Sequence, residues 1–244
     1  SMHITNKNDT TGQFDVEISE IEAKTGVSSI SVAVWSQANQ SDLKWYSAKL
    51  QSDGKYVVNV DIINHKCNYG TYYVDVYGTA NNGVQRYLVG KTVEVKKVKA
   101  IIAAEGNTEE TWFAINASNV KIPGEVKKVQ FAVWSQENGQ DDLIWYDAQQ
   151  LDQSSWKASV QIAKHKTAGM YYADAYAITK NGVSEYIGGT TFNIDKPTVE
   201  NVNIIDRNEP NGTFGVLVSG IHAKAGVNKI QIAVWSSKNQ NDLR

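Results

Sequence analysis

The sequence predicts an all-β protein made of tandem immunoglobulin-like antiparallel β-sandwiches without disulfides. Three observations support this fold class: a pattern of about 100 residues recurs along the chain, apolar residues alternate with a period of two, and a single cysteine, Cys67, excludes any intrachain disulfide. The composition agrees, because 7 Trp and 12 Tyr accompany only 3 Pro and 2 Met, which favours strands over helices or disorder.

The repeat defines the domain organisation. Residues 33–36, 132–135 and 233–236 all read Ala-Val-Trp-Ser, and the three copies align without a gap from Phe14, Phe113 and Phe214 to the tryptophans of these segments. We expect a first repeat at 3–99, a second at 100–200 and the truncated first half of a third at 201–244.

Within a repeat, each strand is indicated by a short apolar stripe. After a first strand near Ile4, the stripes follow in order, and Asn82-Gly83 is typical of a tight hairpin turn. About seven short strands with no helix between them predict the antiparallel sandwich. In the first repeat the strands are expected at residues 14–18, 30–34, 43–48, 56–60, 72–76 and 87–95, after the one near Ile4.

Residues 70–74 and 169–173 resemble the Gly-x-Tyr-x-Cys segment of immunoglobulin strand F. Val74 and Ala173 stand where the cysteine would be. The linkers at 96–100 and 195–199 are short, so we expect a rod of repeats with limited bending.

The half repeat has an apolar face that one chain of this length does not cover by itself. It carries Phe214, Val216 and Val218, then Ile230, Ile232 and Val234. Leaving such a face bare is unfavourable. Two alternatives stay open: further residues after Arg244 complete the repeat, or the half repeat docks on another chain, for example in a strand-exchanged dimer.

Charge and hydropathy exclude several classes of partner. Lys and Arg number 24 against 26 Asp and Glu, with no basic or acidic tail, so we expect no nucleic-acid binding. No apolar run approaches the roughly 18 residues that cross a bilayer, so we expect no membrane insertion.

The residues that could form a catalytic or metal-binding site are explained better by structural roles. His65 and His165 recur in equivalent places, which favours a structural role before strand F over a nucleophilic triad. Cys67 has Thr167 at the matching position and is interpreted as an incidental thiol. We therefore expect no catalytic residue, no metal and no cofactor in this chain.

Acidic residues suggest a glycosidase site and a calcium site, and in both cases a structural explanation is favoured. Asp141-Asp142 and Asp75 are candidates for the paired carboxylates of glycoside hydrolysis, but short loops offer no deep cleft. The loops at 39–42, 138–142 and 239–242 contain calcium-type oxygen ligands, yet Asn, Asp and Gly are also ordinary turn residues.

Alternation along two strands predicts a binding face. If Ile30, Val32 and Val34 face the core, the intervening residues point outward, and the same parity applies to the strand around Val74. Aromatic planes with an acceptor between them suit sugar rings. The expected glycan-binding residues are Trp35, Tyr73, Asp75 and Tyr77 in the first repeat, and Trp134, Tyr172, Asp174 and Tyr176 in the second.

A structural alternative exists for the tryptophans of this face. Trp35 and Trp134 could fold under the following loop and pack against Trp45 and Trp145 as a satellite cluster. On this interpretation, which we favour for the tryptophans, the outward tyrosines are the better surface candidates.

Several ordered motifs resemble the Bsp-like repeat of streptococcal secreted and cell-surface proteins. They are residues 34–36 (VWS) through Asn39, then 42–43 (DL), 45–46 (WY), 64–66 (NHK), 70–72 (GTY) and the 82–83 turn. The resemblance covers both complete repeats and the truncated third. Departures are Lys164 before the second histidine and an extra Gly139 in the second loop.

This resemblance implies a protein secreted to the cell wall or surface of a Gram-positive coccus. In that family such repeats accompany a catalytic module, often a muramidase, amidase or cysteine peptidase that cuts peptidoglycan. The implied role of the repeats is to bind peptidoglycan or wall polysaccharide and position the parent autolysin. The alternative function is a structural spacer or adhesin stalk that binds a host protein.

Overall fold

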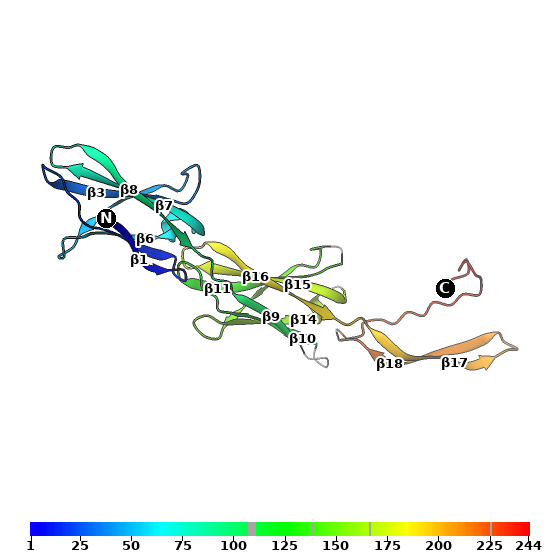
Figure 1. The fold of residues 1–244 in the computed structure, drawn as a ribbon. Coiled ribbons are helices and arrows are strands. Elements are labelled where there is room, and N and C mark those ends of the chain that lie inside the picture. Colours follow the sequence, from blue (N-terminus) through cyan, green and yellow to red (C-terminus); the bar gives the residue numbers. More distant parts are fainter. Residues whose placement is uncertain (107–110, 138, 166, 225) are drawn as a thin grey trace.

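The computed structural model describes residues 1–106, 111–137, 139–165, 167–224 and 226–244. The chain forms two β-sandwiches followed by an open half repeat, arranged one after another along an elongated molecule (Figure 1). The N-terminus lies in the first sandwich and the C-terminus beside the half repeat. The helices among the described residues are two short 3-10 turns, and neither is long and apolar enough to cross a membrane.

The first repeat is a sandwich of two four-stranded sheets. One sheet has the order β1-β2-β6-β5 and the other β4-β3-β7-β8, and all pairings are antiparallel. A 3-10 turn, η1, precedes β7. The bounds are β1 Met2–Asn8, β2 Gln13–Ile18, β3 Val27–Trp35, β4 Lys44–Ser47, β5 Lys49–Leu50, β6 Tyr56–Asp61, η1 Ile62–His65, β7 Gly70–Ala80 and β8 Gln85–Val95.

The second repeat has the same topology. Its sheets have the orders β9-β10-β14-β13 and β12-β11-β15-β16, each strand equivalent to the one eight places earlier. The bounds are β9 Ile101–Gly106, β10 Trp112–Ser118, β11 Val126–Ser135, β12 Ile144–Asp147, β13 Gln149–Gln150, β14 Trp156–Gln161, η2 Ile162–Lys164, β15 Gly169–Thr179 and β16 Ser184–Ile194.

The predicted apolar stripes form the two cores. In the first repeat Phe14, Val34 and Val74 are among the residues buried between the sheets, and Phe113, Val133 and Ala173 occupy the same places in the second. The all-β, immunoglobulin-like fold without disulfides is therefore confirmed. The sequence missed the two-residue strands β5 and β13 and the turns η1 and η2, because segments this short carry no periodicity of their own.

Strand F has the local geometry of an immunoglobulin-type corner. The Tyr72 hydroxyl donates to the Asn68 carbonyl at 2.7 Å, and the Tyr171 hydroxyl donates to the Thr167 carbonyl at 2.5 Å. Both tyrosine side chains are fully buried. Each hydroxyl thus ties the segment before β7 or β15 to the core and fixes where that strand begins.

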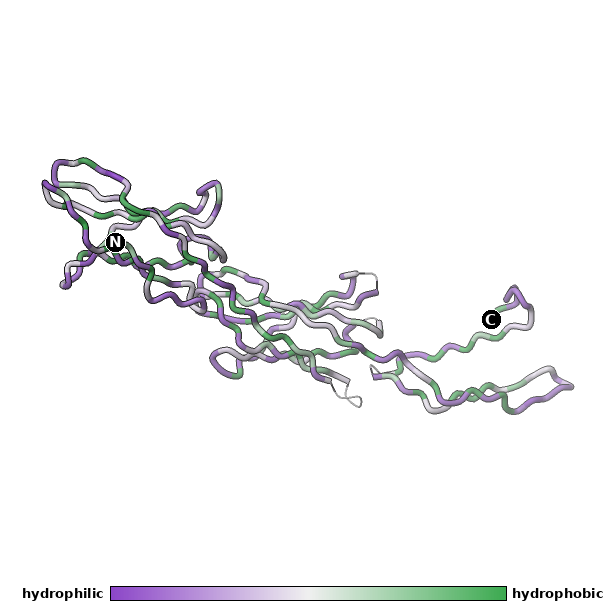
Figure 2. The backbone as a smooth tube through the Cα atoms, in the orientation of Figure 1, coloured by the Kyte–Doolittle hydropathy of each residue, from purple (hydrophilic) through white to green (hydrophobic). Residues whose placement is uncertain are grey.

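The strands that the structure describes in the half repeat form one hairpin, β17 (Thr198–Asn208) and β18 (Thr213–His222). Figure 2 shows hydrophobic residues interspersed with hydrophilic ones along its strands, and a hydrophilic turn between them. The stripe at Ile230, Ile232 and Val234 is equivalent to β3, yet residues 228–235 form no strand. In the complete repeats this segment pairs with β7 or β15, whose equivalents are missing here.

Candidate functional site

The candidate site is the outer face of the sheet β4-β3-β7-β8 in the first repeat. In the register of β3 and β7, Trp35 lies opposite Tyr73, Ala33 opposite Asp75, and Ser31 opposite Tyr77. The neighbours along β7 that point the other way, among them Val74, are buried in the core. The structure therefore places all four predicted residues of this repeat on one outward face.

Stacked rings cover this face in pairs. Trp35 and Tyr73 stack with ring centroids 5.5 Å apart and an interplanar angle of 15°. Tyr77 lies between two further rings, with centroids 5.2 Å from Trp45 and 5.7 Å from Tyr87. Trp45 and Tyr87 are each 55% exposed, so this aromatic cluster reaches solvent.

The second repeat reproduces the arrangement. Trp134 and Tyr172 stack at 5.6 Å, and Tyr176 packs 5.3 Å from Trp145 and 5.6 Å from Tyr186. Trp134, Tyr172, Asp174 and Tyr176 all lie on the outward face of β12-β11-β15-β16, by the same register. We call the two sets the aromatic faces of repeat 1 and repeat 2.

The structure corrects the expected packing of the tryptophans. Trp35 stacks on Tyr73 and Trp134 on Tyr172, whereas Trp45 and Trp145 pack on Tyr77 and Tyr176, so the expected tryptophan–tryptophan cluster under the loop is wrong. The reason is the register: β7 lies on one side of β3 and β4 on the other, and the tyrosines of β7 come closer to each indole.

Sequence reasoning missed part of each aromatic face. Tyr87 on β8 is predicted only as a strand residue, its counterpart Tyr186 on β16 is not predicted at all, and Trp45 and Trp145 are predicted only as packing partners. Their recurrence in both repeats was the available signal. A bulge between β7 and β8 shifts the register next to Tyr77, and a bulge cannot be located from alternation alone.

An acidic residue lies among the rings in each repeat. Asp75 has Ala33 opposite it on β3 and Gly90 opposite it on β8, and Asp174 lies likewise between Ala132 and Gly189. Burial raises the pKa of both carboxyl groups. In the described part of the chain, neither carboxylate has a hydrogen-bond or ion-pair partner.

The recurring histidines form a separate, buried network. His65 Nδ1 is 2.9 Å from the Asp42 carbonyl oxygen, and its Nε2 is 2.8 Å from the Tyr46 hydroxyl. In repeat 2, His165 Nδ1 is 3.3 Å from Asp142 Oδ2 and Nε2 is 3.0 Å from Tyr146. Burial lowers the pKa of both histidines. With no exposed surface, these side chains serve packing rather than chemistry on a substrate.

The acidic loop residues are used inside the loops. Both Asp42 carboxylate oxygens accept from the Ser36 backbone N–H, and one also accepts from Gln37. Burial opposes ionisation, but these hydrogen bonds outweigh it and hold the pKa of Asp42 at about 2. The turn interpretation therefore accounts for this loop. Of the second loop, Asn138 lies outside the described residues, and Asp142 is buried against His165.

Cys67 is a half-buried thiol at the end of η1. Burial and the nearby carboxylate of Glu185 raise its pKa, which disfavours the thiolate. This environment agrees with the interpretation of Cys67 as an incidental residue.

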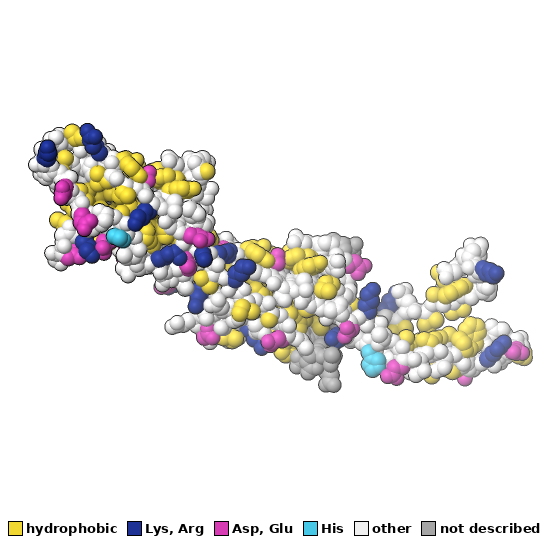
Figure 3. Space-filling view, viewed as in Figure 1, with side chains coloured by type: hydrophobic (Ala, Val, Ile, Leu, Met, Phe, Trp, Pro, Cys, Tyr) yellow, Lys and Arg dark blue, Asp and Glu magenta, His cyan; other side chains and the backbone are white. Residues whose placement is uncertain are grey.

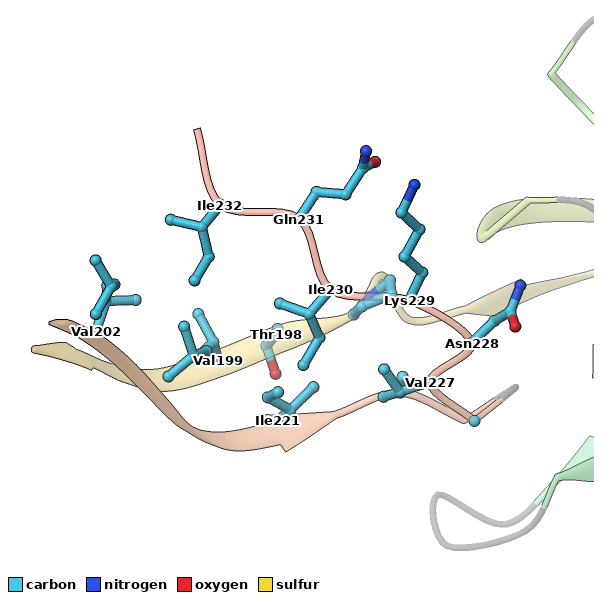
Figure 4. Close-up of a pocket in the computed structure, with 15 residues that line it drawn as sticks. Thr198, Val199, Val202, Ile221, Val227, Asn228, Lys229, Ile230, Gln231 and Ile232 are labelled. Carbon is cyan, nitrogen blue, oxygen red and sulfur yellow. The ribbon is translucent and has the colours of Figure 1, made fainter. Parts of the chain in front are cut away.

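A large hollow lies on the uncovered face of the half repeat. It has a volume of about 600 Å³ and lies between the hairpin β17–β18 and residues 226–232. In Figure 4, Val199, Ile221 and Ile230 point toward one another across it. Figure 3 shows hydrophobic side chains gathered on this part of the molecule. The hollow is thus an unfinished core and not a formed ligand pocket.

Comparison with protein families gives one match that repeats three times. The model described as the GBS Bsp-like repeat matches residues 3–93, 103–192 and 203–244. No curated protein matches the chain. The triple match and the all-β fold indicate an array of structural repeats and a non-catalytic chain.

Solved structures with similar folds are distant. A polysaccharide deacetylase from Bacillus cereus is 13% identical over 42% of this chain, with a TM-score of 0.34, and this chain spans 30% of its length. A tetra-tandem repeat from the extending region of a large adhesion protein is 11% identical, with coverage of 88% of this chain and 61% of that one and a TM-score of 0.35. Fibronectin(III)-like modules of Clostridium thermocellum CbhA are 11% identical, with coverage of 80% and 94% and a TM-score of 0.28. These likenesses concern the fold alone.

Proposed function

Because the chain belongs to the GBS Bsp-like repeat family, we propose that its repeats are non-catalytic modules that bind peptidoglycan or wall polysaccharide and position a secreted Gram-positive autolysin on the wall. Repeats of this family occur in surface proteins. On this proposal the parent protein is a peptidoglycan hydrolase, a muramidase, amidase or peptidase, and these repeats supply its attachment.

The aromatic face is the single observation that carries this proposal. It recurs in both complete repeats with nearly the same centroid distances, and its tryptophan and tyrosine rings are partly exposed. The C–H faces of pyranose rings pack on aromatic planes, and a neighbouring carboxylate accepts hydrogen bonds from hydroxyl groups. Core packing does not require rings on the outside of a sheet, so the repetition favours a ligand.

The joint between the repeats supports binding through several weak sites. Lys97 Nζ lies 2.6 Å from Glu185 Oε1 and donates to the Tyr186 carbonyl at 2.8 Å, and it sits 5.5 Å from the Tyr69 ring. These contacts link the end of repeat 1 to the start of β16 in repeat 2. A joint that limits the distance between two sites raises the effective concentration at the second site.

The test is retention on purified peptidoglycan sacculi, before and after removal of wall polysaccharide. The double variant Tyr73→Ala and Tyr172→Ala is expected to lose retention, whereas Trp112→Ala, an exposed aromatic residue on the opposite sheet, is the matched control and keeps it. If the wild-type chain is retained on intact sacculi but not after wall polysaccharide is removed, polysaccharide is the ligand. Unchanged retention of the double variant shows that the aromatic face is not the site.

The second candidate function is a structural spacer or adhesin stalk that binds a host protein. The elongated arrangement and the short linkers favour it (Figure 1). This candidate predicts no retention on either sacculus preparation. Small-angle scattering from a rod does not separate the two functions, so the retention assay decides between them.

A second copy of the chain is the proposed partner of the half repeat. In a complete repeat, exchanging β1–β4 with β5–β8 leaves both sheet orders unchanged, so the two halves of the repeat occupy equivalent places. Phe214, Val216 and Val218 of a second copy then offer the alternating apolar pattern that Val60, Val58 and Tyr56 offer to β2. Two half repeats can thus cover each other about a twofold axis.

Light scattering over a range of concentrations tests this assembly for residues 1–244. We expect a mass of about 54 kDa, twice the 27.0 kDa of one chain, and a return to the single-chain mass for Val216→Lys. Leu50→Lys, on an exposed edge of repeat 1, is the control that keeps the larger mass. A single-chain mass at every concentration would show that the half repeat does not pair with itself.

A further inference from the structure

Each aromatic face contains one carboxylate whose interactions within the chain are incomplete. Asp75 and Asp174 are half-buried, and among the described residues nothing donates to them or pairs with their charge. Taking a carboxylate partly out of water is unfavourable unless a donor or a cation compensates. The same uncompensated residue stands in both repeats, at the same point of the same face.

Glycine on the neighbouring strand provides the space for this carboxylate. A Cβ atom at Gly90 would lie 2.3 Å from Asp75 Oδ1 and 2.8 Å from the Tyr87 hydroxyl oxygen. At Gly189 the corresponding distances are 2.5 Å to Asp174 Oδ1 and 3.1 Å to the Tyr186 hydroxyl. In both repeats a carboxylate oxygen and a tyrosine hydroxyl therefore lie over a glycine that leaves room for them.

Rings lie on both sides of this point. Across the sheet, Trp45 is opposite Ala33 and Ala33 is opposite Asp75, with strands about 5 Å apart, so the large indole belongs to the row of residues that includes the carboxylate. Tyr77, two residues along β7, contacts both Trp45 and Tyr87. A cation placed beside Asp75 therefore lies next to the Tyr87 hydroxyl, and Tyr77 and Trp45 continue the aromatic surface on the same face.

We propose that each complete repeat binds an ammonium group carried by a wall polymer, with Asp75 or Asp174 as its counter-ion and the surrounding rings as its cation–π partners. The inference rests on the proposed function of the aromatic face and specifies the chemistry of the ligand. Sugars with a free amine and aminoacyl esters both present this group.

An ammonium group fits this site better than a neutral hydroxyl. A hydroxyl donates one hydrogen bond to the carboxylate, whereas an ammonium group donates several and neutralises the charge. Rings within about 6 Å add a cation–π attraction that a hydroxyl does not receive. The raised pKa of both carboxyl groups agrees with a site in which the negative charge is poorly compensated until a cation binds.

Glucosamine and N-acetylglucosamine are the probes for this proposal, because they differ in the charge of the amine and share the sugar ring. Tryptophan fluorescence and calorimetry at about pH 6, where the sugar amine is protonated, measure both affinities on the full chain. We expect glucosamine to bind about tenfold more tightly. Equal affinities would overturn the proposal.

Two double variants isolate the carboxylates. Asp75→Asn with Asp174→Asn is expected to abolish the preference for glucosamine. Asp53→Asn with Asp152→Asn makes the same charge change at exposed positions in the corresponding turns of the two repeats and is expected to keep it. If the Asp75→Asn, Asp174→Asn protein keeps its melting temperature and still prefers glucosamine, the proposal is overturned. Tighter binding of Nα-acetyl-lysine amide than of glucosamine also overturns it, because that result points to a protein ligand.

The failure of this inference can be distinguished from failure of the proposed function. If the Asp75 and Asp174 double variant stays on sacculi as well as the wild-type chain, wall binding by the aromatic face stands and the ammonium group is the wrong ligand. If the chain prefers glucosamine but is not retained on sacculi, the site binds an ammonium group as proposed, and the cell wall is the wrong target.

Discussion

Repeat 1 and the half repeat contain nearly the same strand sequences in different surroundings. Phe14 and Ile30 are 1% exposed, whereas the equivalent Phe214 and Ile230 are 48% and 51% exposed. The segment around Ile30 is a strand, and the segment around Ile230 is not. Alternation in the sequence therefore determines which side chains share a face, while the partner strands β6 and β7 determine whether that face is buried.

The largest expected effect comes from making the same substitution at the equivalent residues Phe14 and Phe214. Phe14→Ala removes a buried ring from the core of repeat 1 and is expected to lower the stability of that repeat by about 3–5 kcal/mol. Phe214→Ala is expected to leave repeats 1 and 2 unchanged and to weaken only the pairing of half repeats. Hydrogen exchange under native conditions, read separately for each repeat, measures both. If Phe214→Ala lowered the stability of repeat 1 as much as Phe14→Ala does, the half repeat would have to pack on repeat 1.

The fold could be predicted because its determinants are periodic. Stripes such as Phe14-Val16-Ile18 and the repetition at about 100 residues fix strand positions, core side and architecture. The missing strand at 228–235 could not be predicted from its own residues, since they match those of β3 and differ only in what pairs with them. Short elements such as β5 likewise depend on the neighbouring strand β6.

The second comparison concerns the loop aspartates, which cap the same turn in a covered and an open repeat. Asp42→Ala removes a buried carboxylate and leaves the part-buried N–H groups of Ser36 and Gln37 without their acceptor, which is expected to cost repeat 1 about 1–3 kcal/mol. Asp242 makes similar bonds to Ser236 and Ser237 in full contact with water, which replaces them when the carboxylate is lost. Exchange rates at these amides are the measurement, and a comparable effect of both variants would show that burial is not the cause.

Acid sensitivity is the third difference between complete and open repeats. Because burial lowers the pKa of His65 and His165, the unfolded chain binds a proton that the folded repeats do not, so stability falls as the pH drops below about 6.5. Asp42, with a folded pKa of about 2, adds a second loss between about pH 3.8 and pH 2, where only the unfolded state is protonated.

Thermal melts across this pH range, with His65→Gln as the variant, check the sign. The loss between neutral pH and about pH 5 is expected to shrink in the variant's first repeat and to persist in the second. Stability that rises on acidification through this window would contradict a neutral, buried histidine.

The candidate site was partly accessible to sequence reasoning. Parity along β3 and β7 is enough to place Trp35, Tyr73, Asp75 and Tyr77 on one outward face, because a strand has a period of two. The contributions of Tyr87 and Gly90 depend on the register across the β7–β8 bulge, which is set by the hairpin and by packing between strands. The ring partners also depend on which strands are neighbours in space.

The smallest expected effect concerns the joint that places one aromatic face relative to the other. Lys97→Ala removes the ion pair with Glu185 and the bond to the Tyr186 carbonyl at a partly exposed site, so we expect a loss of about 1 kcal/mol or less in stability. The consequence for geometry is larger, because Tyr69, Lys97 and Glu185 connect the two repeats. Small-angle scattering should show a broader distribution of lengths for this variant than for Lys99→Ala. Equal distributions would mean that the linker, and not these side chains, limits the bending between repeats.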